Sequence, residues 1–112
     1  MESGNLNYYS ADNIRYVFID GNTCDTIEKC YITLAQQLSI PDYFGYNLDA
    51  LEEVLADLEW IEEEKIIFIV LNSGALLDAE PDLKDDFLSI LNTSDNLRVE
   101  VKGLPGNQKE IN

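Results

Sequence analysis

Carboxylates are the side chains in this sequence whose number and spacing could do chemistry. The stretch from Asp42 to Glu64 holds nine Asp or Glu residues and no Lys or Arg. Paired acids can hydrolyse glycosides from opposite sides of a sugar-sized cleft, whereas acids one helical turn apart lie on a convex surface. No stretch has the alternating Asp and Asn residues, central Gly and terminal Glu of a calcium loop. We therefore expect these acids to bind a partner rather than to catalyse a reaction or to hold a metal.

The residue types that are missing narrow the chemistry further. The chain has no His, which excludes Ser–His and Cys–His nucleophiles and His-containing zinc sites. Cys24 and Cys30 are expected to be reduced thiols of a cytoplasmic protein, because the first ten residues show no signal-peptide pattern. The sequence therefore predicts a protein that is not an enzyme and that needs no cofactor or metal.

The overall charge indicates the kind of partner. Of 112 residues, 22 are Asp or Glu and 7 are Lys or Arg, so the formal net charge is -15. Nucleic-acid binding needs a basic surface that displaces counterions from phosphates, and this chain carries the opposite field. The longest apolar run, Ile66–Leu71, has six residues, too few to span a membrane. We therefore expect neither nucleic acid nor a membrane as partner, but a cationic protein that this field would steer toward the chain.

Hydrophobic patterning predicts alternating strands and helices. Short apolar runs bounded by turn residues predict strands at Ile14–Asp20, Lys65–Asn72 and Leu97–Lys102. The middle run lacks alternation, which is typical of a parallel-sheet strand buried on both faces by helices. The third run alternates, as in a strand with one face in water.

Apolar residues at helical spacing predict the helices that join these strands. They cover Thr26–Leu38, Leu48–Leu58 and a segment opened by Pro81, with one further helical turn at Ala75–Leu77. Asp25 and Glu28 resemble a capping box at the start of the first helix. Asn47 is the expected N-cap residue of the second helix.

This order of elements predicts the fold class. Strands joined by helical crossovers form an α/β fold, here a small three-stranded parallel sheet packed by about three to four helices, with right-handed connections. A chain of this length is expected to form a single domain over residues 1–112. The lead at residues 1–13 and the tail at residues 103–112 are expected to be loose.

The second predicted helix separates its apolar residues from its acids. At about 100° per residue, one arc holds Leu48, Leu51, Val54, Leu55 and Leu58. The opposite side holds Asp49, Glu52, Glu53 and Asp57, with Ala56 between them. Acids at positions i and i+4 repel each other, and no Lys relieves this repulsion. An interface is therefore favoured over the alternative, a solvated surface face.

Aromatic rings in the preceding loop strengthen this interpretation. Tyr43, Phe44 and Tyr46 surround Gly45, and the three rings cannot all reach the same core. An exposed ring beside carboxylates resembles the centre of a protein interface with an electrostatic surround. Such a surface can occupy a site that normally binds phosphates and bases.

The loop and the start of this helix resemble a known family. The segment Ile40-Pro41-Asp42-Tyr43-Phe44-Gly45-Tyr46-Asn47-Leu48-Asp49-Ala50-Leu51 is similar to the central segment of the barstar family of intracellular ribonuclease inhibitors. That family's pattern is an aliphatic–proline pair, an acid, two aromatics and glycine, followed by asparagine–leucine–aspartate–alanine–leucine. The predicted order of elements also agrees with the family's fold.

The resemblance implies a mechanism and a set of roles. In the family, this loop and helix plug the active site of a basic secreted ribonuclease, and the helix carboxylates stand in for RNA phosphates. Asp49 then matches the first helix acid, and Glu53 matches the acid that docks into the phosphate-binding subsite. Tyr43, Gly45 and Asn47 match loop positions that contact the enzyme.

Several positions depart from the family's pattern. Glu53 is one methylene longer than the family's aspartate, and Tyr46 replaces an acid. Glu52 replaces a tryptophan that contacts the enzyme, and Ser89 aligns with an acid late in a following helix. These departures imply a cationic toxin other than the family's best-known ribonuclease.

The leading hypothesis is an immunity protein of a toxin–antitoxin or contact-dependent inhibition system. As a monomer, it would form a 1:1 complex with a basic nuclease toxin, most simply a ribonuclease. The expected toxin-binding residues are Tyr43, Phe44, Gly45, Tyr46, Asn47, Asp49, Glu52, Glu53, Ala56 and Asp57. Two alternatives stay open: immunity against a toxin of another chemistry, such as a DNase, and an acidic regulatory module without a toxin partner.

Overall fold

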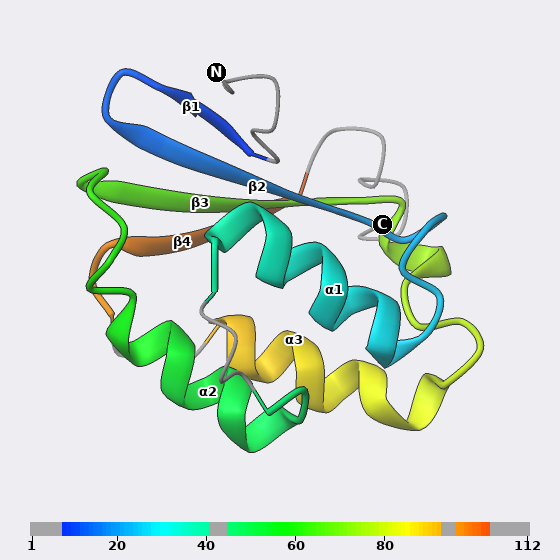
Figure 1. Ribbon diagram of the computed structural model, residues 1–112. Coiled ribbons are helices and arrows are strands. Elements are labelled where there is room, and N and C mark those ends of the chain that lie inside the picture. Colours follow the sequence, from blue (N-terminus) through cyan, green and yellow to red (C-terminus); the bar gives the residue numbers. More distant parts are fainter. Residues whose placement is uncertain (1–7, 41–44, 93–95, 104–112) are drawn as a thin grey trace.

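Four strands form the sheet, in the order β1–β2–β3–β4. The computed structural model describes residues 8–40, 45–92 and 96–103. Strands β2, β3 and β4 are parallel, and β1 pairs with β2 in antiparallel orientation (Figure 1). The strands are Tyr9–Ala11 (β1), Ile14–Asp20 (β2), Lys65–Leu71 (β3) and Val99–Gly103 (β4). The predicted α/β class with three parallel strands is confirmed.

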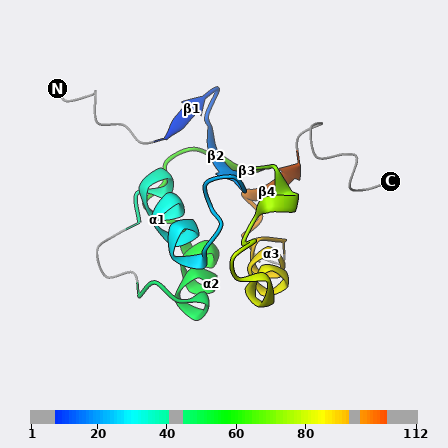
Figure 2. The same cartoon turned by 90° about the vertical axis from the view of Figure 1, so that its right-hand side faces the viewer.

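Three α-helices lie on the same side of this sheet (Figures 1 and 2). They are α1 (Ile27–Leu38), α2 (Leu48–Asp57) and α3 (Lys84–Asn92), and two 3₁₀ turns, η2 (Ser73–Ala75) and η3 (Pro81–Leu83), connect β3 to α3. The middle strand is buried on both faces, as predicted, since Ile66, Ile67, Phe68, Ile69 and Val70 are all buried. The described α-helices, however, cover only one of these faces (Figure 2). None of the described helices is long and apolar enough to cross a membrane.

The core lies between the sheet and the helices. Alternate residues of β2 and β3, namely Val17, Ile19, Ile66, Phe68 and Val70, point toward the helices and are buried. They pack with buried residues of all three helices, including Leu34, Leu38, Leu51, Leu55, Phe87 and Leu91. The apolar arc of α2 therefore contributes to the core as its spacing predicts.

The N-terminal edge of the sheet differs from the prediction. The expectation that residues 1–13 are loose is wrong for Tyr9–Ala11, which form β1. Asp12 and Asn13 have φ angles of 56° and 66°, as both central residues of a type I′ hairpin turn require. Asp and Asn tolerate this conformation better than most residues do, so this pair is the local sequence signal for the hairpin.

Two predicted element ends also shift. Thr26 is the N-cap of α1, since its side chain accepts a hydrogen bond from the Lys29 N–H at 3.3 Å. The predicted cap residue, Asp25, instead forms an ion pair with the Lys29 ammonium at 2.9 Å. Leu97 is 97% exposed and lies before β4, which begins at Val99.

A side chain completes the outer edge of β2 beyond the hairpin. β1 pairs only with Ile14–Tyr16, so the next outward-facing backbone groups, those of Phe18, have no strand beside them. The Gln37 amide of α1 accepts a hydrogen bond from the Phe18 N–H and donates one to its C=O, each at 2.8 Å. The edge of β2 is therefore satisfied by backbone at one end and by a side chain at the other.

Candidate functional site

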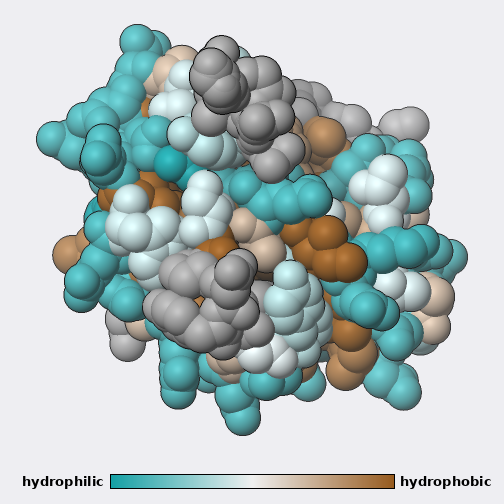
Figure 3. Space-filling view, in the orientation of Figure 1, coloured by the Kyte–Doolittle hydropathy of each residue, from teal (hydrophilic) through white to brown (hydrophobic). Residues whose placement is uncertain are grey.

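The exposed side of α2 carries a cluster of carboxylates. Asp49, Glu52, Glu53 and Asp57 are all exposed, and Ala56 is exposed among them; we call these four acids the acid face. Leu51, Val54 and Leu55 on the opposite side of the helix are buried. Figure 3 shows hydrophilic side chains along the lower edge of the molecule, where α2 lies in Figure 1. The predicted division of this helix into an apolar side and an acidic side is therefore present.

No described cation neutralises the acid face. Each of the six described Lys and Arg side chains binds elsewhere, to the following partners: Arg15 to Glu63, Lys29 to Asp25, Lys65 and Lys102 to Glu100, Lys84 to the Ser73 carbonyl, and Arg98 to backbone carbonyls. Among the described residues, the acid-face carboxylates form no ion pair. No described cation therefore offsets the repulsion among these carboxylates. Their negative potential would attract a cationic partner.

Asn47 is the N-cap residue of α2, as the sequence predicts. Its side-chain oxygen accepts a hydrogen bond from the Ala50 N–H at 2.8 Å. Its amide nitrogen donates to the Gly45 carbonyl at 3.2 Å. A Cβ atom at Gly45 would lie 3.1 Å from that amide nitrogen, so a small residue suits this position. Both residues shape the turn that leads into the acid face.

Tyr46 stands between this turn and α1. Its backbone has a φ of 53°, a conformation that costs a non-glycine residue roughly 1–2 kcal/mol. The residue is 47% exposed, and its ring packs edge-on against Tyr31 of α1, with ring centroids 6.1 Å apart. Tyr31 belongs to the buried side of α1, so helical spacing indicates its burial but not its contact with the loop.

The aromatic loop is only partly described. Tyr43 and Phe44, two of the predicted toxin-binding residues, lie outside the described residues. The structure brings the other predicted residues together along one side of α2 and its entry turn. They are Gly45, Tyr46, Asn47, Asp49, Glu52, Glu53, Ala56 and Asp57, and all are exposed.

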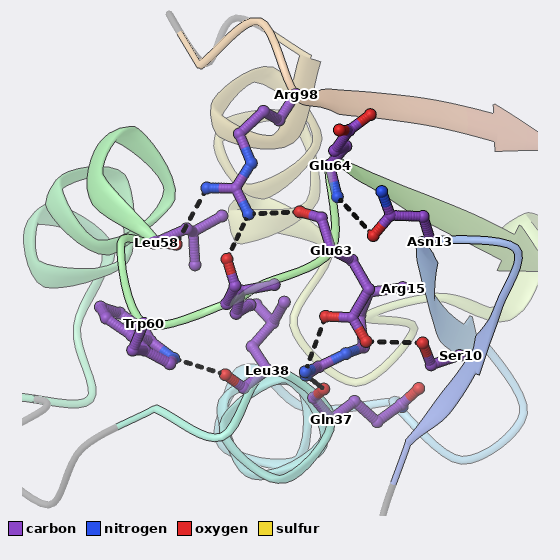
Figure 4. Close-up of polar contacts among 11 residues, drawn as sticks. Ser10, Asn13, Arg15, Gln37, Leu38, Leu58, Trp60, Glu63, Glu64 and Arg98 are labelled. Atoms are coloured by element: carbon purple, nitrogen blue, oxygen red, sulfur yellow. Dashed lines mark hydrogen bonds and ion pairs between the residues drawn. The ribbon is translucent and has the colours of Figure 1, made fainter.

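Arg98 holds the chain that leaves α2. Leu58 ends the helix in the left-handed conformation, with a φ of 49°. The Arg98 guanidinium donates hydrogen bonds to the carbonyls of Leu58 at 3.1 Å, Ile61 at 2.6 Å and Glu63 at 2.6 Å (Figure 4). A cation near the C-terminus of a helix also complements the helix dipole. The alternating pattern of the sequence predicts that Arg98 faces water, so this pattern does not reveal the role of Arg98 in the fold.

A buried ion pair lies behind the same segment. Arg15 is only 6% exposed, and its guanidinium lies 3.1 Å from a carboxylate oxygen of Glu63 (Figure 4). Burial opposes ionisation of Glu63, but hydrogen bonds from Ser10 and Arg15 outweigh it and lower the pKa of the carboxyl. Glu63 therefore serves the fold, although it belongs to the acid-rich stretch of the sequence. We call Arg15, Glu63 and Arg98 the anchor cluster.

A cavity of about 330 Å³ adjoins the anchor cluster and is lined by Tyr8, Arg15, Ser39, Trp60, Glu62 and Glu63. The Tyr8 ring lies 3.6 Å from the Arg15 guanidinium carbon. The Trp60 ring N–H donates to the Leu38 carbonyl at 2.8 Å and ties the segment after α2 to the end of α1. The described residues contain no group of three side chains that could hold a metal ion.

The two cysteines lie under the first turns of α1. Cys24 and Cys30 are both free and buried. The thiols interact with each other, and the hydrogen bond from Cys30 is the main cause that lowers the pKa of Cys24 to about 6. The same interaction and burial raise the pKa of Cys30. Neither thiol reaches the acid face.

The sequence of this chain matches a known protein family. The family model described as Barstar (barnase inhibitor) matches residues 14–104. The chain belongs to the barstar family. The match begins at the first residue of β2 and ends one residue beyond β4, so it includes the three parallel strands and all three α-helices. The hairpin strand β1 lies outside this barstar match.

A curated relative agrees with this assignment. The chain is 30% identical over 92 residues to a protein of Bacillus subtilis (strain 168) named "Putative ribonuclease inhibitor YrdF". The alignment covers 70% of this chain and 99% of that protein. The predicted membership of the barstar family is therefore confirmed, and α2 with its entry turn is the barstar segment that carries the acid face.

Proposed function

We propose that this barstar-family protein is an immunity protein that binds a cationic bacterial ribonuclease toxin and blocks its active site. It acts in the cytoplasm of the cell that makes it, and each chain binds one toxin molecule. The acid face enters the site that the toxin uses for RNA phosphates. The loop before α2, with Tyr43 and Phe44, packs beside it.

The observation that carries this proposal is the uncompensated acid face on a rigid helix. Four carboxylates are exposed on α2, and each described cation is engaged elsewhere. A protein that needed α2 only for its core would gain from mixed charges there. A ribonuclease active site is cationic because it binds phosphates, so it is complementary to this face.

A titration of ribonuclease activity tests the proposal. Barnase and other basic bacterial ribonucleases, including any encoded next to the gene, are assayed for RNA cleavage with increasing amounts of the protein. We expect one of them to lose activity at a 1:1 ratio. The double variant Asp49→Asn/Glu53→Gln should weaken this inhibition at least a hundredfold, roughly 3 kcal/mol.

A matched variant controls for the loss of charge. Asp78→Asn/Asp82→Asn removes the same charge from exposed acids outside α2 and should change the affinity less than threefold. Both double variants should keep the wild-type circular dichroism spectrum. Equal inhibition by the acid-face variant and the wild type would rule out the proposed interface.

The same assay separates the alternatives. Protection against a DNase with the same dependence on Asp49 and Glu53 would assign the face to a toxin of another chemistry. A protein that inhibits no nuclease, in a genome without a neighbouring toxin gene, would instead be an acidic regulatory module.

A further inference from the structure

The cavity beside the anchor cluster lies next to the barstar loop and helix but outside the acid face. Ser39, which ends α1, lines the cavity directly before the loop that leads into α2. Trp60 and Glu62 line it from the segment that follows α2. At about 330 Å³, the cavity is at the lower end of the size range of ligand pockets. It can therefore receive one side chain or a ligand of similar size.

The charges that line this cavity favour a cation. Glu62 is exposed, and it forms no ion pair or hydrogen bond among the described residues. Glu63 and Arg15, the other charged residues of the lining, neutralise each other across 3.1 Å. The cavity also adjoins the C-terminal end of α1, whose last turn holds no basic residue, and this end of a helix attracts positive charge. The lining therefore has a net negative charge that no described cation offsets.

An anion is not favoured, although Arg15 contributes to the lining. One nitrogen of its guanidinium donates to the Gln37 carbonyl at 3.0 Å, and another pairs with Glu63 (Figure 4). The third nitrogen, Nε, has no hydrogen-bond partner but is buried out of reach of solvent. The Tyr8 ring lies against the same guanidinium. An anion in the cavity would therefore be repelled by Glu62 and would find no accessible donor on Arg15.

Aromatic rings in the lining favour a guanidinium over an ammonium. Trp60 and Tyr8 both line the cavity, and the bond from the Trp60 ring N–H to the Leu38 carbonyl fixes the position of the indole. Cations bind to the faces of aromatic rings, to Trp most strongly, and Arg does so more often than Lys. A guanidinium is also more weakly hydrated than an ammonium, so it loses less on leaving water. The lining therefore suits an arginine side chain.

Exposed acids continue along the chain from the acid face to the cavity. Asp57 belongs to the acid face, Glu59 follows α2, and Glu62 lines the cavity. A cationic partner bound to the acid face is therefore attracted toward the cavity as well. We propose that the cavity receives one arginine side chain of the toxin. This inference rests on the proposed function, because it assigns a second contact to the same toxin.

A titration without the toxin tests the cavity by itself. Trp60 is the only tryptophan of the chain, so a fluorinated tryptophan gives one fluorine NMR signal, which reports on the cavity. We expect N-acetyl-arginine amide to shift this signal saturably, and Glu62→Gln to weaken that binding roughly threefold. Glu64→Gln removes the same charge from an exposed residue outside the lining and should not weaken it. N-acetyl-lysine amide should bind more weakly, and N-acetyl-glutamine amide should give no saturable shift.

A double-mutant cycle tests the contact with the toxin. Each arginine of the inhibited nuclease is replaced by Ala, and its affinity is measured for the wild-type chain, Glu62→Gln and Glu64→Gln. One arginine should be coupled to Glu62: its removal should weaken binding roughly tenfold to the wild type and to Glu64→Gln, but only about threefold to Glu62→Gln. Circular dichroism confirms that each variant is folded.

Four results would overturn the inference. The first is a fluorine signal that arginine amide leaves unchanged or that all three amides shift alike. The second is binding of lysine amide as tight as that of arginine amide, and the third is equal binding of arginine amide by the wild type and Glu62→Gln. The fourth is a toxin without an arginine coupled to Glu62, in which case inhibition through the acid face would still stand. Failure of the proposed function is a separate result: no nuclease is inhibited, and the assignment of the cavity to a toxin falls with it.

Discussion

The acid face lies along the exposed side of α2, and the anchor cluster lies beyond the C-terminal end of the same helix. The two regions use charged residues for opposite purposes. The acid face exposes four carboxylates without a described cation beside them. The anchor cluster buries Arg15 against Glu63 and directs Arg98 at backbone carbonyls. Charge that holds the fold is paired and shielded from water, and charge left unpaired on the surface is available to a partner.

Reversing one charge of the acid face should give the largest effect. Glu53→Lys places a cation where the proposed toxin is cationic, so the toxin affinity should fall roughly a thousandfold, about 4 kcal/mol. The urea midpoint should stay unchanged or rise slightly, because repulsion with Asp49 and Asp57 is relieved. Calorimetric titration and urea unfolding measure the two quantities. Asp78→Lys serves as the control, and equal losses of affinity in both variants would contradict a local role.

Removing the Arg98 guanidinium should lower the stability of the fold rather than the affinity for the toxin. Arg98→Ala removes the guanidinium donors from three carbonyls, of which that of Leu58 keeps the Ile61 N–H at 3.2 Å, and should lower the free energy of unfolding by about 3 kcal/mol. Urea unfolding measures this loss. Arg98→Lys keeps the charge but not the planar fork of donors, so it should recover only part of the stability. Lys102→Ala, on the exposed end of β4, should change stability by less than about 0.5 kcal/mol.

The Glu63 carboxylate predicts how stability depends on pH. Its pKa in the folded protein is lowered from the ordinary value of 4.5, so the unfolded chain binds its proton first. The stabilisation is therefore complete above pH 4.5 and is lost as the pH falls through the folded pKa. Glu63→Gln should be less stable by about 2 kcal/mol at neutral pH. Unfolding curves at several pH values should show this difference shrinking in acid, and a constant difference would contradict the role of ionisation.

The cap at the start of α2 should give the smallest effect. Asn47→Ala removes the bond to the Ala50 N–H and should lower the free energy of unfolding by about 1 kcal/mol. Asn47→Asp keeps a capping oxygen and should cost less than half as much. Toxin affinity should fall no more than tenfold in either variant, because the Asn47 amide is engaged within the turn. A much larger loss in both variants would mean that this side chain contacts the toxin directly.

Local patterns were sufficient to predict most of the fold. The bounds of β2 agree with its apolar run, and Asn47 caps α2 as its residue type indicates. The family segment around α2 was also recognisable, because loop and helix residues combine there in a specific order. These features depend on neighbours in the chain, which a single sequence displays directly.

Contacts between distant segments were the part that could not be predicted. Arg98 binds carbonyls 35 to 40 residues earlier, and backbone carbonyls have no residue-type signal. Glu63 is indistinguishable in the sequence from its exposed neighbours until Arg15 is placed beside it. The alternating pattern before β4 also misplaced Leu97, since alternation alone does not show where pairing begins.

The Gln37 amide at the edge of β2 has a consequence for assembly in the cell. It occupies the hydrogen-bonding position of a neighbouring strand at Phe18, next to an apolar sheet. An unprotected strand edge is a template for adding further chains, and proteins block such edges in several ways. Here one side chain from α1 does so, which ties resistance to fibril growth to correct docking of α1. A chain whose first helix detaches would therefore lose its globular packing and its protection against aggregation together.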